Sequence, residues 1–367
     1  MLRFYFNITL NLFITMKKVL LLTLLVAISS CVYAQMLDKA ESRQLKSFLN
    51  QSSVNGVTNA DALKVSNINN LSNIEGVVIQ NGHITSIKWV DKHLSGNLDL
   101  SSFKMLKSVD VSRNKLSSLS VANNPSLVDL NASKNILTSV DFSNCPELKS
   151  ISIQKNRLTE ISIVSSPLIE QLNVYDNLFV ELNVSNSTSL KSLNCQSCHL
   201  ESLLVDGCTG LKTLDCAFNK LTSLNLFGVE NLQNLNVSDN QFTTMIVSGL
   251  PSLGTFVCSN NKMTTLALRN CNNLTDLDCS YNNLTTLSVK SCPNLMFVDC
   301  SYNDLIMLNL SNQNQLMRLL CDHNQLNTLD VSFDINLTYI NCNYNMISDF
   351  RTIGCDNLRM VSNHWNF

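Results

Sequence analysis

The hydrophobic positions of this chain recur with a fixed period. From Leu106 onward an apolar residue opens every block of 21 residues, without an insertion or a deletion. With that residue counted as position 0, further apolar residues recur at positions 3, 5, 10, 13 and 15. Twelve full blocks precede a partial thirteenth, which begins at Leu358. A strict period of this length is typical of a repeat protein in which each block forms one coil of a solenoid.

Asparagine is as regular as the apolar residues. Position 8 is Asn in eleven of the twelve full blocks, and Cys198 occupies it in the other. The combined pattern, L-x-x-L-x-L-x-x-N/C-x-L, is that of the leucine-rich repeat. An amide at the turn of each coil can satisfy backbone groups that would otherwise be buried without partners. We therefore expect a column of inward-facing Asn side chains.

Two short extended segments are predicted in each block. Apolar and polar residues alternate around positions 3 and 5, as in Leu277-Asp278-Cys279, which predicts a strand. These strands should form one parallel sheet on the concave side. A second alternation at positions 13 and 15, as in Leu224-Asn225-Leu226, predicts short extended segments on the convex side. The expected fold is a β-rich leucine-rich repeat solenoid that curves only gently.

The segment before the repeats is predicted to close the first coil. Residues 35–83 are assigned to an amino-terminal cap, because an open solenoid end exposes apolar core. Within it, Ala40, Leu45, Phe48 and Leu49 stand at near-helical spacing. This spacing predicts a short amphipathic helix over residues 39–49.

The repeat domain is assigned to residues 84–367. Its first coil, residues 84–105, follows the template but has 22 residues, and the extra residue falls around Ser95-Gly96-Asn97. At the other end, Trp365 and Phe367 are expected to fold over the last coil and cover its apolar core.

Residues 1–34 are expected to be removed on export. A secretory signal beginning at Met16 has two lysines, an apolar stretch and the small-residue site Val32-Tyr33-Ala34. Residues 1–15 are interpreted as an upstream mis-start. The preferred outcome is cleavage after Ala34, and the alternative is a lipidated amino terminus at Cys31. Both place the protein outside the cytoplasm, secreted or at the cell surface, without membrane insertion after signal removal.

The net charge and the positions of the cysteines limit which partners and which cross-links are expected. The net charge is -2 and there is no long basic stripe, so nothing favours nucleic acid as a partner. The fourteen cysteines suggest disulfides until they are placed in the repeat. Stacked cysteines have parallel Cβ directions, which disfavours a disulfide, so we predict buried free thiols. Seven share position 5: Cys195, Cys216, Cys258, Cys279, Cys300, Cys321 and Cys342. Five share position 18: Cys145, Cys208, Cys271, Cys292 and Cys355.

The repeats resemble those of the bacterial internalin-type surface proteins, in particular the variant with 21-residue repeats and a cysteine ladder. The phrases LTDLDCSYNNLTTL (274–287) and LKTLDCAFNKLTSL (211–224) show this resemblance, which covers residues 84–367. It implies a non-enzymatic adhesin or binding module. An LPxTG wall-sorting signal and a following Ig-like domain are missing, so wall anchoring and host-cell invasion are not implied.

No catalytic or cofactor site is expected. The string Cys195-Gln196-Ser197-Cys198-His199 has the spacing that attaches haem, but the repeat pattern already accounts for both cysteines. The five histidines fall in different coils without a partner at a spacing known from hydrolases or metal sites. We therefore predict no catalytic residues, no metal and no cofactor.

The predicted ligand site lies on the concave surface of the last coils. Positions 2, 4, 6 and 7 should face solvent there, and their residues change from Ser and Asn in early coils to aromatic and charged residues later. Exposed aromatics beside carboxylates and an Arg suit a protein or glycan ligand. The candidate residues are Asp278, Tyr281, Phe297, Asp299, Tyr302, Arg318, His323, Tyr339 and Tyr344.

Two other interpretations remain open for these residues. Stacked Tyr rings can simply shield one edge of the sheet. The protein can also be a structural component of a cell envelope or matrix, with an enzyme as a remote third reading. The preferred hypothesis is an exported, monomeric, non-catalytic binding module.

Overall fold

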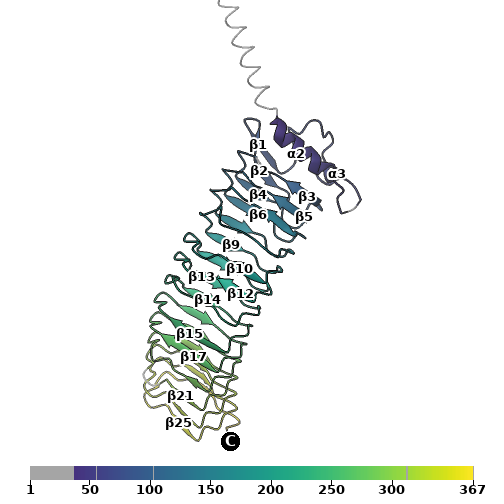
Figure 1. The fold of residues 1–367 in the computed structure, drawn as a ribbon. Helices are drawn as coiled ribbons and strands as arrows, with labels where there is room; N and C mark the ends of the chain where they lie inside the picture. The colour runs from purple at the N-terminus through teal and green to yellow at the C-terminus, as the bar shows by residue number, and fades with distance from the viewer. Residues whose placement is uncertain (1–36, 55, 102, 311–312, 367) are drawn as a thin grey trace, which may run out of the picture.

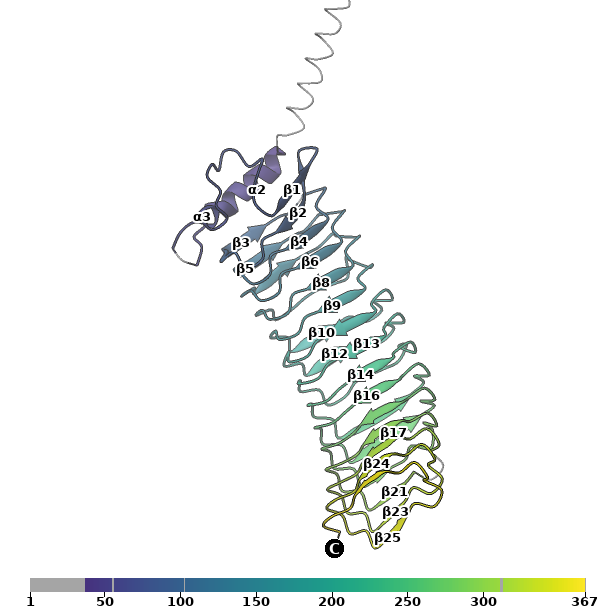
Figure 2. The ribbon, with the colours of Figure 1, turned by 180° about the vertical axis from the view of Figure 1, so that it is seen from behind.

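The protein forms a gently curved column of stacked coils with two helices at its amino-terminal end (Figures 1 and 2). The computed structural model describes residues 37–54, 56–101, 103–310 and 313–366. The predicted signal sequence and Cys31 lie outside these residues. Within them, no helix is long and apolar enough to cross a membrane.

One sheet of fifteen strands runs along the concave side of the described chain. Its first two strands form an antiparallel hairpin, and every later strand pairs parallel with the preceding one. In order these strands are β1 (Val77–Gln80), β2 (His83–Lys88), β4 (Ser108–Asp110), β6 (Asp129–Asn131), β8 (Ser150–Ser152), β9 (Gln171–Asn173), β11 (Ser192–Asn194), β13 (Thr213–Asp215), β14 (Asn234–Asn236), β16 (Thr255–Val257), β18 (Asp276–Asp278), β20 (Phe297–Asp299), β22 (Arg318–Leu320), β24 (Tyr339–Asn341) and β26 (Met360–Ser362).

The convex side carries shorter sheets, as the second alternation predicts. They contain β3 (Ser95–Asp99), β5 (Lys115–Ser120) and β7 (Ser139–Asp141); β10 (Glu181–Asn183) and β12 (Ser202–Leu204); β15 (Thr244–Ser248) and β17 (Thr265–Arg269); and β19 (Thr286–Leu287), β21 (Met307–Asn309), β23 (Thr328–Asp330) and β25 (Asp349–Arg351). The pairing of β3 with β5 shifts register between Gly96 and Asn97, where the sequence has its extra residue. The β-rich solenoid with a parallel concave sheet is therefore confirmed.

The Asn column joins neighbouring coils, as expected. The amide of Asn282 donates to the carbonyl oxygens of Cys258 (3.0 Å) and Cys279 (3.2 Å), which hold the same position in adjacent coils. Its Oδ1 accepts from the backbone N–H of Met263 at 3.0 Å. Each position 8 amide thus satisfies groups of its own coil and of the preceding one. At the exception, Cys198 Sγ donates to the carbonyl oxygen of Val174 at 3.1 Å.

A second ladder lies at position 18, on the opposite turn. There Cys145 Sγ donates to the carbonyl oxygen of Val121 in the preceding coil at 3.1 Å, and Cys355 Sγ makes the equivalent bond to Val331 at 2.9 Å. Asn124 at the same position donates its amide to three carbonyl oxygens. The recurrence of buried Cys at position 18 was predicted from the sequence, but its hydrogen bonds to the preceding coil were not.

The thirteen described cysteines are buried and free. The thiols of position 5 fill the core between the two sides of the solenoid, where other coils place Val or Ile. Burial raises the pKa of the Cys279 and Cys300 thiols well above its usual range, because desolvation disfavours the thiolate. These thiols therefore behave as small apolar side chains.

The amino-terminal cap contains the predicted helix. Helix α2 (Lys39–Leu49) begins at Asp38, whose side chain accepts from two backbone N–H groups. Its Phe48 stacks on Trp89 of the first coil, with ring centroids 5.9 Å apart. A short helix α3 (Asn59–Ala62), not expected from the sequence, follows with a capping box between Thr58 and Asp61.

The last described coil differs from the expectation. Trp365 does not fold over it but stacks on Tyr344 and is 59% exposed. The prediction of a Trp365 cover is therefore wrong, because the ring continues a row of aromatic side chains along the coils. Phe367, the second residue of that prediction, lies outside the described residues.

Candidate ligand-binding surface

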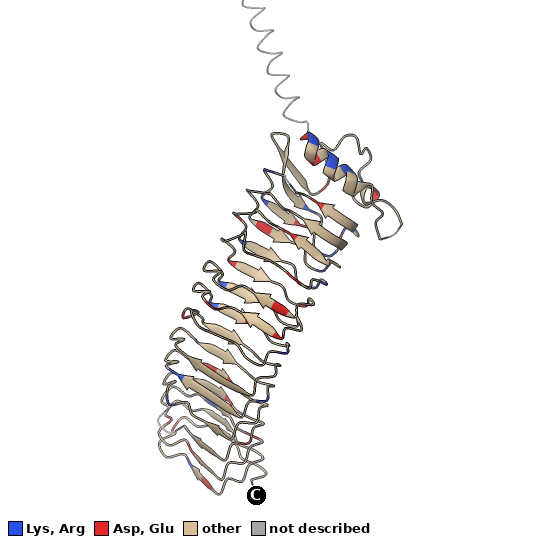
Figure 3. Ribbon diagram, viewed as in Figure 1, with Lys and Arg blue, Asp and Glu red and all other residues tan. Residues whose placement is uncertain are grey.

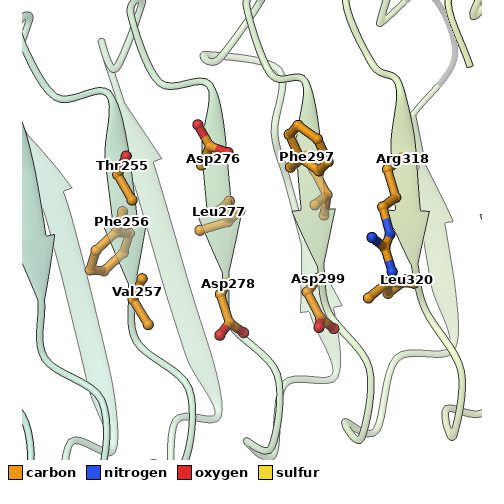
Figure 4. Close-up of a pocket in the computed structure, with 11 residues that line it drawn as sticks. Thr255, Phe256, Val257, Asp276, Leu277, Asp278, Phe297, Asp299, Arg318 and Leu320 are labelled. Carbon is orange, nitrogen blue, oxygen red and sulfur yellow. The ribbon is translucent and has the colours of Figure 1, made fainter.

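A shallow pocket of ≈ 310 Å³ lies on the concave sheet across four neighbouring strands, β16, β18, β20 and β22. Positions 2 and 4 of these strands point to solvent because side chains alternate along a strand. Position 4 therefore supplies a row of neighbouring side chains: Val257, Asp278, Asp299 and Leu320 (Figure 4). Position 2 supplies a second row: Thr255, Asp276, Phe297 and Arg318.

Two carboxylates occupy the centre of the position 4 row. Oδ1 of Asp278 accepts from the backbone N–H and the hydroxyl of Ser280, at 3.0 and 2.6 Å. Oδ1 of Asp299 accepts in the same way from Ser301. These bonds hold each carboxyl in a fixed orientation on the turn that follows its strand. Among the described residues, no donor reaches the Oδ2 atoms, which remain available to a ligand.

The electrostatics of this surface are acidic. Burial raises the pKa of Asp299, and the negative charges of Asp278 and Asp322 raise it further, against hydrogen bonds from Ser301 that lower it. The guanidinium of Arg318 lies 4.9 Å from the ring centroid of Tyr339, which orients it over that ring. Phe297 is 41% exposed between these groups. The pocket thus combines an exposed aromatic ring, two carboxylates with free oxygens and an Arg on its side.

A stack of aromatic rings runs beside the pocket, formed by position 7 of the last coils. The ring centroids are 4.3 Å apart for Tyr281 and Tyr302, 4.1 Å for Tyr302 and His323, 4.3 Å for His323 and Tyr344, and 6.1 Å for Tyr344 and Trp365. His323 Nδ1 lies 2.8 Å from Asp322 Oδ2. We call these five residues the aromatic row.

The backbone explains where the aromatic row lies. Position 7 is in the turn after the strand, and its residue has positive φ, for example 51° at Tyr281 and 53° at Tyr302. The same holds in the early coils, at Arg113 (58°) and Lys134 (56°). A left-handed backbone disfavours bulky side chains, so five successive aromatic residues there are not what the turn itself prefers.

The nine predicted site residues therefore fall into two adjacent groups. Asp278, Phe297, Asp299, Arg318 and Tyr339 belong to the concave pocket and its rim. The other four belong to the aromatic row: Tyr281, Tyr302, His323 and Tyr344. Asp322 connects the groups, because its other carboxylate oxygen accepts from Asn341 on β24 at 2.8 Å.

Sequence reasoning missed Val257 and Leu320 at the two ends of the position 4 row. They are recognisable only by comparison between coils, because every other repeat from Leu106 onward has Asp, Asn or Ser at position 4. Trp365 was also missed, since it was assigned to the end of the solenoid instead of to the aromatic row. The signal was present, because Trp365 stands at position 7 of the last block.

The early coils provide an internal comparison. A similar concavity of ≈ 210 Å³ spans β2, β4, β6 and β8. Its position 2 and 4 residues are Ser86, Lys88, Ser108, Asp110, Asp129, Asn131, Ser150 and Ser152, which are all polar. The curvature of the sheet is thus common to both regions, and the apolar side chains are specific to the carboxyl-terminal one.

No group of metal-ligating side chains is present in the part of the chain that the structure describes. The thiols of Cys195 and Cys198 in the C-x-x-C-H string are both buried. Lys and Arg are scattered along the coils without a continuous stripe (Figure 3).

No family model and no curated protein matches the chain. Among solved structures, the internalin InlF of Listeria monocytogenes aligns at 17% identity over 87% of this chain and 94% of its own, with a TM-score of 0.57. A leucine-rich repeat protein of Leptospira interrogans aligns at 20% identity over 74% and 78%, also with a TM-score of 0.57. The functional domain of InlJ from Listeria monocytogenes, which includes a cysteine ladder, aligns at 24% identity over 75% of this chain with a TM-score of 0.45. This chain spans 54% of that domain's length. The chain therefore has the leucine-rich repeat fold, as its sequence pattern predicts.

Proposed function

We propose that this protein is an exported, non-catalytic binding module that recognises a partner protein through the concave pocket and the aromatic row. The observation that carries the proposal is the contrast between the two ends of one sheet. Solvent-facing positions that are polar in β2 to β8 become Val257, Phe297 and Leu320 in β16 to β22. The core does not require these changes, because these positions point away from it. Exposed aromatic anchors beside charged groups are typical of the energetic centre of an interface.

A protein partner is favoured over a glycan by the stacking of the rings. A sugar packs against the face of an aromatic ring, but the faces within the aromatic row cover one another at separations of 4.1 to 4.3 Å between Tyr281 and Tyr344. What this row presents to a ligand is ring edges and hydroxyl groups, which suit the side chains and backbone of a protein. The exposure of Phe297 adds an apolar contact of the same kind.

Export is proposed from the sequence of residues 16–34, which has the features of a secretory signal. An exported binding module of this kind would act as an adhesin or receptor-binding protein.

The proposal is tested by probing the protein against an array of purified extracellular and cell-surface proteins and, in parallel, a glycan array. We expect protein ligands whose binding falls about a hundredfold in the double variant Phe297→Ala/Tyr302→Ala, since aromatic anchors contribute about 2 kcal/mol or more each. The matched control is Gln171→Ala/Thr213→Ala, at position 2 of β9 and β13, which should bind as the wild type does. A ligand that binds the aromatic double variant unchanged places the site elsewhere. Binding of glycans alone, through Phe297, contradicts the preference for a protein.

A further inference from the structure

The position 4 row has a defined order of chemistry across the pocket. From β16 to β22 it reads Val257, Asp278, Asp299 and Leu320, with one side chain on each strand (Figure 4). Adjacent strands are about 4.8 Å apart, so the apolar ends lie about 14 Å apart with the two carboxylates between them. A ligand lying along this row would meet an apolar contact, negative charge and a second apolar contact.

The two carboxylates are not neutralised by the protein itself. Among the described residues, no salt bridge involves Asp278 or Asp299. Arg318, the basic residue that lines the pocket, is placed over Tyr339. Of the other acidic groups facing the pocket, Asp276 accepts from the Thr275 hydroxyl and Asp322 contacts His323. The mutual repulsion of these charges contributes to the raised pKa of Asp299 and would be relieved by a bound cation.

We propose that the pocket binds an arginine or lysine side chain carried by an extended segment of the partner protein. The inference rests on the proposed binding function and specifies the chemistry of its partner. The cationic group lies between the Oδ2 atoms of Asp278 and Asp299, and the alkyl part of the side chain packs on Leu320 and Phe297. Arg and Lys have this form, because an apolar stem carries a charged end. Arg fits best, since its guanidinium presents five donors in a planar fork and can bridge two carboxylates.

The residues two places before and after the basic side chain on the partner should be apolar, because alternate side chains of an extended segment share one face. At about 3.3 Å per residue, two residues cover the distance of about 7 Å from the central carboxylates to either end of the row. Val257 and one face of Phe297 are then available to neighbouring apolar side chains.

The inference is tested with immobilised pentapeptides of the form acetyl-Leu-Ala-X-Ala-Leu-amide, in which X is Arg, Lys, citrulline, norleucine or Glu. The labelled protein is applied in EDTA-containing buffer at pH 7.5. We expect retention on X = Arg and X = Lys to exceed that on citrulline and norleucine at least about tenfold, because charge-assisted hydrogen bonds are the stronger ones. The variant Asp278→Asn/Asp299→Asn keeps the Asx turns and should lose this preference.

The matched control is Asp110→Asn/Asp129→Asn in the polar concavity of the early coils, which should retain the preference of the wild type. The inference is overturned by equal retention of the Arg, citrulline and Glu peptides, by retention of no peptide, or by an Arg preference that survives in the Asp278→Asn/Asp299→Asn variant. A protein ligand that is lost in Phe297→Ala/Tyr302→Ala but kept in that Asp variant would refute the basic side chain while leaving the proposed function intact.

Discussion

The side chains at positions 8 and 18 lie at the two turns of each coil, and polar residues there can form hydrogen bonds with buried backbone groups. Position 8 uses Asn, whose amide and carbonyl oxygen bond to two coils at once. At position 18, Asn124 and Cys145 donate to the preceding coil, whereas Val229 and Leu250 place apolar side chains there. A buried polar side chain that cannot reach such an acceptor is therefore left without a partner inside the protein.

The first prediction concerns neighbouring asparagines of identical chemistry. Asn282 is buried and forms four hydrogen bonds to backbone groups, whereas Asn283 is exposed. We expect Asn282→Ala to lower the free energy of unfolding by about 1–3 kcal/mol or more, because it leaves buried groups unpaired. Asn283→Ala should change it by less than about 0.5 kcal/mol. Urea denaturation of both variants measures the difference, and equal midpoints would show that the assigned register is incorrect.

The second prediction concerns Asp334, which occupies position 18. Burial raises its pKa to about 7, and its Oδ2 is buried without a partner. In the unfolded chain an Asp loses its proton near pH 4, so between about pH 4 and pH 7 the unfolded state binds fewer protons than the folded state. The stability contributed by Asp334 is therefore present below pH 4 and is lost as the pH rises to about 7.

The variant Asp334→Asn is expected to remove this pH dependence. Its amide can donate to backbone carbonyl oxygens, as Asn124 does at the same position. At pH 8 we expect the variant to be more stable than the wild type by more than about 1 kcal/mol, and at pH 4 the two should be close. Thermal unfolding at both pH values is the measurement. A wild type that is the more stable at pH 8 would refute the account of Asp334.

At the scale of an element, the turn after each concave strand carries its own constraint. Its position 7 residue is left-handed in early and late coils alike, although the side chains change from Arg and Lys to stacked aromatics. Stacking contributes about 0.5–1.5 kcal/mol for a pair of rings, comparable to the 1–2 kcal/mol that the backbone conformation costs a residue with a Cβ. In the aromatic row, the free energy gained by stacking is therefore similar to the free energy that the left-handed backbone costs.

The third prediction separates these two contributions at Tyr302. Tyr302→Ala and Tyr302→Gly both remove the ring, but only Gly adopts φ of +53° without strain. We expect the Gly variant to be more stable than the Ala variant by about 1 kcal/mol in thermal unfolding. At Asn283, which has no positive φ, the order should reverse, with Ala more stable than Gly. The same order at both sites would contradict a strained turn.

A helix or strand could be predicted from the sequence where the same type of residue recurs at the same repeat position and has the same surroundings each time. The Leu and Asn residues do so in nearly every coil, with Ile169 and Cys198 as exceptions, and the period alone predicted the strands that they specify. Helix α2 followed from Leu45, Phe48 and Leu49 at helical spacing. The left-handed turn could not be predicted, because Arg, Lys, Asp and Tyr all occupy it and none marks a positive φ. The turn separates the aromatic row at position 7 from the pocket residues at positions 2 and 4. Because the turn was not predicted, the sequence analysis placed both groups together on the concave surface.

At the scale of the whole molecule, the two sides of the solenoid differ in continuity. The concave sheet pairs without interruption, but the described convex strands form four separate sheets, with breaks between β7 and β10, β12 and β15, and β17 and β19. Ser166 stands at position 18 of the coil between β7 and β10. The Ser166 hydroxyl is buried without a partner, since it is too short to take the place of Cys or Asn. A cavity of ≈ 550 Å³ lies there, between Ile163 and Val184. In a repeat protein, where each coil contacts only its neighbours, the unpaired hydroxyl and the cavity weaken the contacts of this one coil.

The fourth prediction restores the missing bond between this coil and the preceding one. Ser166→Cys should donate to the preceding coil as Cys145 does, and so raise the free energy of unfolding by about 1 kcal/mol. Amide exchange of Ile161 and Ile163 should slow while that of Leu214, in β13, stays unchanged. Ser223→Cys, at an exposed position of a later coil, is the control and should have neither effect. Faster exchange of Ile161 in Ser166→Cys would contradict the ladder account.

The coil between β7 and β10 has an unpaired convex side and a cavity, so we expect the column to be mechanically weakest there. Under a pulling force along its long axis, coils joined on both sides resist separation more than coils joined on one side. We expect the column to part first between β7 and β10 in single-molecule stretching. The fragment beyond this point contains the entire pocket and aromatic row, so a bound partner would stay attached to intact coils while the tether lengthened. A gap that lowers thermal stability would in this way let the column lengthen under load without releasing its partner.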